Sequence, residues 1–179
     1  TQASGLSEDI QYFGGRVRDR AFAKLKPFYP KIQVTKEIAQ DRDDLKGLVG
    51  QELTIMAWIW ARTVRSPNPV VSGAMVPLFA SSWLATKPGK EAWIEPVINE
   101  DGISYEFKVR KVGQPAIGET VNRRGGTCLL TKSPIDFKHI RAEGKAGRLG
   151  QRLMAIVAEG SRGRIYLSPT REMEEKIGR

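Results

Sequence analysis

The most constraining feature of this chain is residues 53–64, where β-branched and aromatic residues dominate and apolar side chains occupy both alternating sets of positions. In a strand, Trp58 and Trp60 would point to one side, and Ala57 and Ile59 to the other. A strand that is apolar on both faces must be covered on both faces. The segment therefore predicts a central strand, and the N-terminal helix is one candidate cover for it.

That amphipathic helix is predicted over residues 8–28, with Ser7 as its N-cap and Pro27 near its end. Its apolar residues recur every three or four positions, as one face of a helix requires. Gly14 and Gly15 weaken it, by about 1 kcal/mol each relative to Ala. The apolar positions are Ile10, Phe13, Val17, Ala21, Leu25 and Phe28.

Short antiparallel strands are predicted over much of the remaining chain. Residues 103–109 alternate strictly between apolar and polar side chains, which is typical of a half-buried strand, and 99–102 would form a hairpin turn before it. Further predictions are strands over 74–84, 93–98, 126–130, 151–158 and 164–167, a helical turn over 41–47, a loop with one helical turn over 137–150, and a helix over 170–177. The predicted class is α+β, a mostly antiparallel sheet with helices at both ends.

The chain has 179 residues, enough for one domain with its own core. We divide it into an N-terminal helix and connector (1–50), a β module (51–135), and a basic loop, hairpin and C-terminal helix (136–179). We expect these parts to form one unit cut from a longer chain. No apolar run reaches the roughly 18 residues that span a membrane. The single Cys excludes an internal disulfide, which fits a cytoplasmic location.

The net charge of +9 favours a polyanionic partner. The positive charge is concentrated in residues 121–152, which hold eight Lys and Arg residues against two acidic ones, whereas residues 37–52 are acid-rich. This asymmetry predicts nucleic-acid contact by the basic segment. The alternative is that these charges are ordinary solvated surface residues.

The sequence shows no catalytic constellation. His139 is the only histidine, and its neighbours Lys138 and Arg141 suit a surface or phosphate-facing residue better than a catalyst. Cys128 lies in an apolar run, as a buried structural thiol would. Neither a P-loop nor a dinucleotide fingerprint occurs. We therefore assign no residue of this chain a catalytic role.

Two short turns have the spacing of a metal site but lack most of its ligands. A structural zinc needs four Cys or His ligands, usually in two closely spaced pairs. The corresponding positions here are Ser66, Ser72, Cys128 and Thr131, and only Cys128 can supply a thiolate. No zinc is therefore expected. Ordinary turns around one buried thiol are the alternative interpretation.

Three stretches of the sequence together resemble a known family. The first runs from Tyr29-Pro30 through Gly50-Gln51-Glu52-Leu53-Thr54 and leads into 57–64. The second is Ser66-Pro67-Asn68-Pro69 followed by 76–78 and 82–87, and the third is 140–148. The set resembles the large adenine-specific DNA methyltransferases that contain a zinc ribbon and a domain of unknown function. By this resemblance Ser66 and Ser72 match the ribbon's first cysteine pair, with one extra residue between them, and Cys128 and Thr131 match the second. The resemblance implies a degenerate zinc-ribbon-like hairpin module that has lost its metal.

The resemblance also implies an accessory, DNA-contacting domain of an S-adenosylmethionine-dependent N6-adenine methyltransferase. The family's methyl-donor loop and its Asp/Asn-Pro-Pro-aromatic motif would lie outside these residues, so this segment would bind no cofactor. Such an enzyme extrudes its target base, and a basic accessory domain would hold the phosphates. The expected DNA contacts are Arg123, Arg124, Lys138, Arg141, Lys145 and Arg148, with Arg62 and Arg65 as further candidates.

Three other interpretations stay open. The domain could be a scaffold that docks on the rest of the enzyme, or on a partner subunit, through the first helix with Trp58 and Trp60. It could bind RNA, which would need exposed aromatics such as Tyr166 and Phe137 beside the basic loop. It could also be an enzyme in its own right, which the missing motifs disfavour. A parent methyltransferase could serve restriction, phage defence or housekeeping modification.

Overall fold

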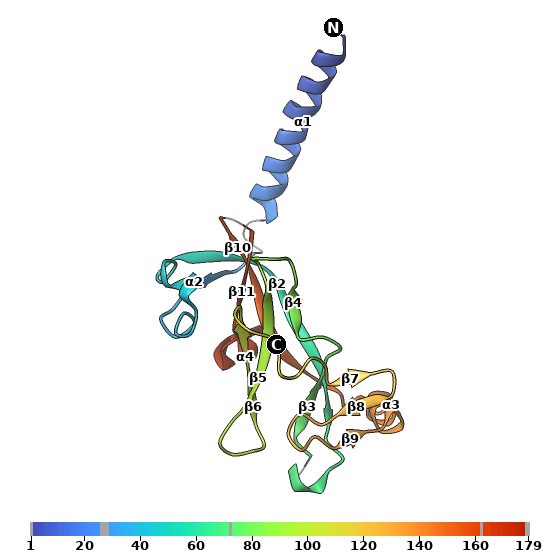
Figure 1. Ribbon diagram of the computed structural model, residues 1–179. Helices are drawn as coiled ribbons and strands as arrows, with labels where there is room; N and C mark the ends of the chain where they lie inside the picture. The colour runs from blue at the N-terminus through green and yellow to red at the C-terminus, as the bar shows by residue number, and fades with distance from the viewer. Residues whose placement is uncertain (1, 26–28, 72, 162, 178–179) are drawn as a thin grey trace.

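The structure, a computed structural model, describes residues 2–25, 29–71, 73–161 and 163–177 (Figure 1). Those residues form a mixed α and mostly antiparallel β fold with four helices and three sheets, which confirms the predicted class. None of their helices is both long and apolar enough to cross a membrane. The helices are α1 (Gln2–Leu25), α2 (Asp43–Lys46), α3 (Phe137–Lys145) and α4 (Arg171–Ile177), with a 3₁₀ turn at Pro69–Val71.

The largest sheet is assembled on β2 (Glu52–Arg65), which confirms the central strand predicted from residues 53–64. One edge of β2 pairs with β10 (Gly150–Gly160), and β10 pairs with β11 (Gly163–Leu167) in the predicted hairpin. The other edge of β2 pairs with β1 (Lys31–Gln33) near its start and with β3 (Met75–Leu78) near its end. Each of the three sequence divisions thus contributes a strand to one sheet.

Two register shifts in the β2–β10 ladder leave Met56 and Met154 without a partner across the ladder. Such bulges bend the strands and increase their twist. Trp58 and Trp60 pack on one core cluster, whereas Ile59 packs on another. The predicted division of these side chains between two faces of β2 is therefore correct.

A second sheet covers the Ile59 face. It consists of β4 (Trp83–Ala85), β5 (Ala92–Ile98) and β6 (Tyr105–Arg110). The predicted strand over 74–84 is wrong in its continuity, because the chain leaves the first sheet after β3. There the backbone N–H of Phe79 donates to Thr120 Oγ1 (2.9 Å), and that hydroxyl donates to the Pro77 carbonyl oxygen (2.7 Å). The shared core contains Ala61, Phe79, Ile94, Tyr105, Phe107, Leu129 and Met154.

The connector 34–48 covers the other face of β2. Its apolar residues Val34, Ile38 and Leu45 are buried against the β2–β10 ladder. The prediction that the N-terminal helix covers β2 is wrong, because α1 projects away from the sheets (Figure 1). α1 also begins at Gln2, so Ser7 lies inside the helix and is not its N-cap. The predicted helix end at Pro27 and Phe28 falls outside the described residues.

One buried arginine holds this connector in place. Arg42 is 5% exposed, and its guanidinium donates to both carboxylate oxygens of Asp44 (2.7 and 2.9 Å). It also donates to the carbonyl oxygens of Val109 in β6 (3.3 Å) and Tyr166 in β11 (3.1 Å). Burial raises the pKa of Asp44, but the hydrogen bonds and charges of Arg42 and Lys111 outweigh it, so the net pKa is lowered. The ion pair thus ties the connector to both sheets.

A third, small sheet lies beside the end of the β2–β3 pair. Its strands are β7 (Val121–Asn122), β8 (Gly125–Thr127) and β9 (Pro134–Ile135), and β9 leads directly into α3. The sequence predicted only one helical turn here, but α3 has nine residues. Asp136 caps it by accepting the backbone N–H of Lys138 (2.9 Å). The core beneath contains Val64, Val76, Cys128 and Ile135, with Leu78, Leu130, Ile140 and Leu149 packed against it.

Two glycines allow the small sheet to pack this closely. Gly125 has φ +148°, and a methyl group added there would lie 3.0 Å from the Ile135 carbonyl oxygen. A methyl group on Gly126 would lie 3.4 Å from atoms of Leu78, Ile135 and Ile140 at once. The glycine pair therefore brings β8 against β9, α3 and β3 together.

We expect Gly125→Ala to lower the free energy of unfolding by about 1–3 kcal/mol, because it combines a left-handed backbone with a steric clash. Gly118→Ala is the matched control, since a methyl group there has no neighbour within 4 Å. The control should change stability by less than about 1 kcal/mol. Urea unfolding measures both, and equal midpoints for the two variants would contradict the packing described.

Candidate functional site

The positive charge gathers on one helix face. Lys138, Arg141 and Lys145 are spaced three and four residues apart, so they lie on the same face of α3, and all three are exposed. The opposite face is anchored by Ile140, which packs on the core, and by the buried Glu143. The helix is therefore oriented with its basic face toward solvent.

The β7–β8 turn adds two more exposed arginines, Arg123 and Arg124. Asn122 shapes this turn, because its Oδ1 accepts the backbone N–H of Arg124 (2.9 Å). A groove of about 510 Å³ is lined by residues that include Arg124 and Asp136, the cap of α3. We call residues 121–148, which comprise β7 to β9 and α3, the basic module (Figure 1).

Unlike the other predicted contacts in the basic module, Arg148 is held in an ion pair. Its guanidinium makes two hydrogen bonds to the Glu143 carboxylate (2.6 and 3.0 Å), and its backbone N–H donates to the Glu143 carbonyl oxygen (2.9 Å). The hydrogen bond from Arg148, and then its charge, lower the pKa of Glu143. Arg148 thus closes the end of α3, which the sequence did not indicate.

The two remaining candidates lie on β2. Arg65 is exposed at the end of the strand, and its carbonyl oxygen accepts a hydrogen bond from His139 Nε2 (2.8 Å), which joins β2 to α3. Arg62 is exposed in the sheet between Leu78 and Gln151. The structure therefore brings Arg123, Arg124, Lys138, Arg141 and Lys145 together in the module, places Arg65 beside it, and leaves Arg62 on the sheet.

Two of the four expected ligand positions are in contact. Ser66 Oγ and Cys128 Sγ lie 3.4 Å apart, both buried, although 62 residues separate them in sequence. Each also accepts a backbone N–H from its own turn, since Asn68 donates to Ser66 Oγ (3.3 Å) and Thr131 donates to the Cys128 sulfur. Ser72 lies outside the described residues. Two turns from distant parts of the chain therefore converge on one point.

Hydrogen bonds lower the pKa of the Cys128 thiol. Burial raises the pKa of Cys128, but the hydroxyl groups of Ser66 and Thr131 and backbone N–H groups outweigh it, so the net pKa is lowered. Thr131 Oγ1 also shares a hydrogen bond with Ser133 Oγ (2.7 Å). Across 2–25, 29–71, 73–161 and 163–177, no group of three or more His, Cys, Asp or Glu residues could hold a metal ion. The cluster holds its turns together by hydrogen bonds and packing.

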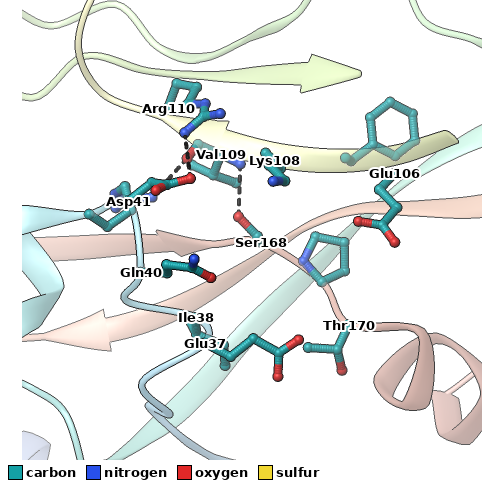
Figure 2. Close-up of a pocket in the computed structure, with 13 residues that line it drawn as sticks. Glu37, Ile38, Gln40, Asp41, Glu106, Lys108, Val109, Arg110, Ser168 and Thr170 are labelled. Atoms are coloured by element: carbon teal, nitrogen blue, oxygen red, sulfur yellow. Dashed lines mark hydrogen bonds and ion pairs between the residues drawn. The ribbon is translucent and has the colours of Figure 1, made fainter. Parts of the chain in front are cut away.

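A pocket of about 160 Å³ lies between the connector, β6 and the segment that follows β11 (Figure 2). Arg110 pairs with Glu95 (2.7 Å) and Asp41 (3.3 Å), and Ser168 Oγ accepts the backbone N–H of Val109 (2.9 Å). No His or Cys is among its described lining residues. These bonds join elements of the fold, and among the described lining residues neither Ser168 nor Thr170 is hydrogen-bonded to a carboxylate that could act as its base.

The aromatic residues expected of an RNA-binding module are not gathered at one place. Phe137 is half-buried at the start of α3, with the Arg141 guanidinium 5.6 Å from its ring centre. Tyr166 lies in β11, which belongs to a different sheet. The two aromatic residues expected to stack on bases therefore do not form one surface beside the basic module.

The Arg148–Glu143 pair should make stability depend on pH. Because the pKa of Glu143 is lowered in the folded state, its contribution is present above pH 4.5, the ordinary pKa of a glutamate, and is lost as pH falls through the lower folded value. We expect Glu143→Gln to be less stable than the unsubstituted chain at pH 7, with a difference that disappears in acid. Thermal unfolding between pH 3 and pH 7 tests this, with the exposed Glu100→Gln as control; a difference independent of pH would contradict it.

No protein-family model, curated protein or solved structure matches this chain. The resemblance to adenine-specific methyltransferases is therefore carried by the sequence motifs alone and stays a prediction. The functional argument depends on the charge and geometry described above.

Proposed function

We propose that this chain is an accessory DNA-contacting domain of an S-adenosylmethionine-dependent, adenine-specific (N6) DNA methyltransferase in the cytoplasm. In this proposal the rest of the enzyme supplies the cofactor site and the catalytic residues. One observation carries it: the basic module has seven exposed Lys and Arg side chains, five of them predicted contacts that form no ion pair with the described residues, and its two acidic residues already have partners. Asp136 caps α3, and Glu143 pairs with Arg148.

The dimensions of α3 suit a phosphate backbone. Lys138 and Lys145 lie about 10 Å apart along the helix axis. Over that distance a DNA duplex carries about six phosphate charges on its two strands. A rigid helix with its charged face in solvent can contact several phosphates without reorganising. Such contacts fix register and orientation and leave base selection to the enzyme's catalytic part.

The finer fold assignment, a degenerate zinc-ribbon-like module, belongs to the same proposal. The contact between Ser66 and Cys128 supports it, as do the backbone N–H groups that each turn directs at these side chains. Lys132 (φ +59°) and Gly73 (φ +75°) put both turns through the left-handed region at corresponding points. In this interpretation the buried side chains of the third core cluster replace the metal.

A second candidate is a scaffold that makes protein contacts and no nucleic-acid contact. The exposed apolar residues of α1 favour it. Trp58 and Trp60, expected as part of the same docking surface, contribute little to it because they pack against the core under the connector. The two candidates differ in whether the chain binds DNA.

We expect the chain to bind a labelled DNA duplex with a steep salt dependence, and the variant Lys138→Ala/Arg141→Ala/Lys145→Ala to bind more weakly. Each lost phosphate contact should reduce the magnitude of the log Kd against log salt slope by about 0.9. Fluorescence anisotropy over a range of salt concentrations measures this. Arg148 is kept in this test because its loss would leave Glu143 buried without a partner.

The matched control removes the same amount of charge elsewhere. Lys36, Lys87 and Arg164 are exposed and lie outside the basic module. Their triple alanine variant should keep most of the slope. If both triple variants lost the same part of the salt slope, DNA binding would depend on the net charge of the chain and not on the face of α3. No binding by the unsubstituted chain at low salt would favour the scaffold.

A further inference from the structure

α1 is a long helix, and none of its described residues belongs to the three core clusters. Its 24 residues extend about 36 Å, and every residue from 5 to 25 is exposed except the half-buried Gly15. Most of the stability of a helix in a protein comes from packing of its apolar face, and Gly14 and Gly15 weaken α1 at its middle. The helix therefore needs a packing partner.

The partner must cover an apolar stripe. Its members recur at intervals of three or four residues, which places them along one face of α1. The large ones are between 49% and 69% exposed. The apolar stripe consists of Leu6, Ile10, Phe13, Val17, Ala21 and Leu25.

We propose that the apolar stripe packs antiparallel against the same stripe of a second copy of this chain. A two-fold axis between Phe13 and Gly14 places Leu6 against Ala21 of the second copy. The same axis places Phe13 against Gly14, where a methyl group would have no neighbour within 4 Å. Leu6 and Phe13 thus meet small residues, and Ile10 meets Val17, which fills the space between the two helices.

The charges of α1 favour the same orientation. Glu8 and Asp9 lie in its first half, and Arg16, Arg20 and Lys24 lie in its second. Arg18 is already paired with its neighbour Asp19 (3.0 Å). In the antiparallel arrangement Asp9 lies on the flank that carries Arg16 and Arg20 of the second copy, whereas a parallel arrangement would bring like charges together.

The symmetry of the apolar stripe favours a second copy of this chain over other partners for α1. A two-fold contact uses the same patch twice, so the patch must be complementary to itself. The stripe meets this condition in both size and charge about its own midpoint. A helix that lies on a membrane instead carries a largely basic polar face, and the polar face of α1 mixes acidic and basic residues.

The first test is the mass of the 179-residue chain by sedimentation equilibrium. We expect about twice the 19.9 kDa of one chain. Ile10→Asp/Val17→Asp should raise the dimer Kd at least about tenfold, and Gln11→Asp/Ala23→Asp, on other faces of α1, should not. Both variants should keep the thermal unfolding of the sheets, because these side chains do not pack on them. A monomer at about 100 µM, or a dimer unaffected by the stripe variant, would overturn the proposal.

The second test addresses orientation by cross-linking. Under oxidising conditions Ile10→Cys/Val17→Cys should form a covalent dimer, because position 10 faces position 17 of the second copy. Ile10→Cys alone should not, since its two copies lie about 10 Å apart along the axis, beyond disulfide reach. Cys128 is buried and does not interfere. The reverse result would indicate a parallel pair and refute the arrangement. Neither test involves DNA, so the outcome is independent of the proposed function.

Discussion

The antiparallel ladder between β2 and β10 is the interaction on which the rest of the structure depends. It joins Thr63 to Gly150 at one end and Ile55 to Ala158 at the other, so the chain must return over a long sequence distance to complete it. Because β2 is apolar on both faces, burial drives other segments onto both. The connector 34–48 covers one face and the β4–β6 sheet covers the other. The basic module packs where the same ladder ends, beside β3.

Arginines that the sequence does not distinguish have different roles in the structure, because some are paired inside the fold and others face solvent. Arg42 is buried, and its hydrogen bonds to Asp44 and two carbonyl groups compensate the cost of removing its charge from water. Arg148 compensates the buried Glu143. On α3, Arg141 faces solvent together with two lysines and remains available to an anion. Arginines that are paired with an acidic residue of the fold therefore stabilise the structure, whereas arginines without such a pair are candidates for binding.

The two surfaces with proposed partners lie at opposite ends of the molecule. α1 projects from one end, and the basic module lies at the other, with the sheets between them (Figure 1). A pair of chains joined through α1 would leave both basic modules free. Self-association and DNA contact can therefore be changed separately, by substitutions in the apolar stripe and on the exposed face of α3.

The sequence alone determined the elements whose pattern is local. β-Branched and aromatic residues located β2, strict alternation located β6, and turn residues bounded β5 and the β10–β11 hairpin. The charge asymmetry located the basic segment. The sequence misjudged the strand over 74–84, which Thr120 interrupts from far along the chain, and α3, whose nearby glycines disfavoured a helix. Only the tertiary structure decided which segments cover β2, that α1 covers none, and that Arg148 is paired. The first two outcomes depend on contacts between residues distant in sequence, which no local pattern encodes. The Arg148–Glu143 pair spans only five residues, but it needs the turn that ends α3 to bring the two side chains together.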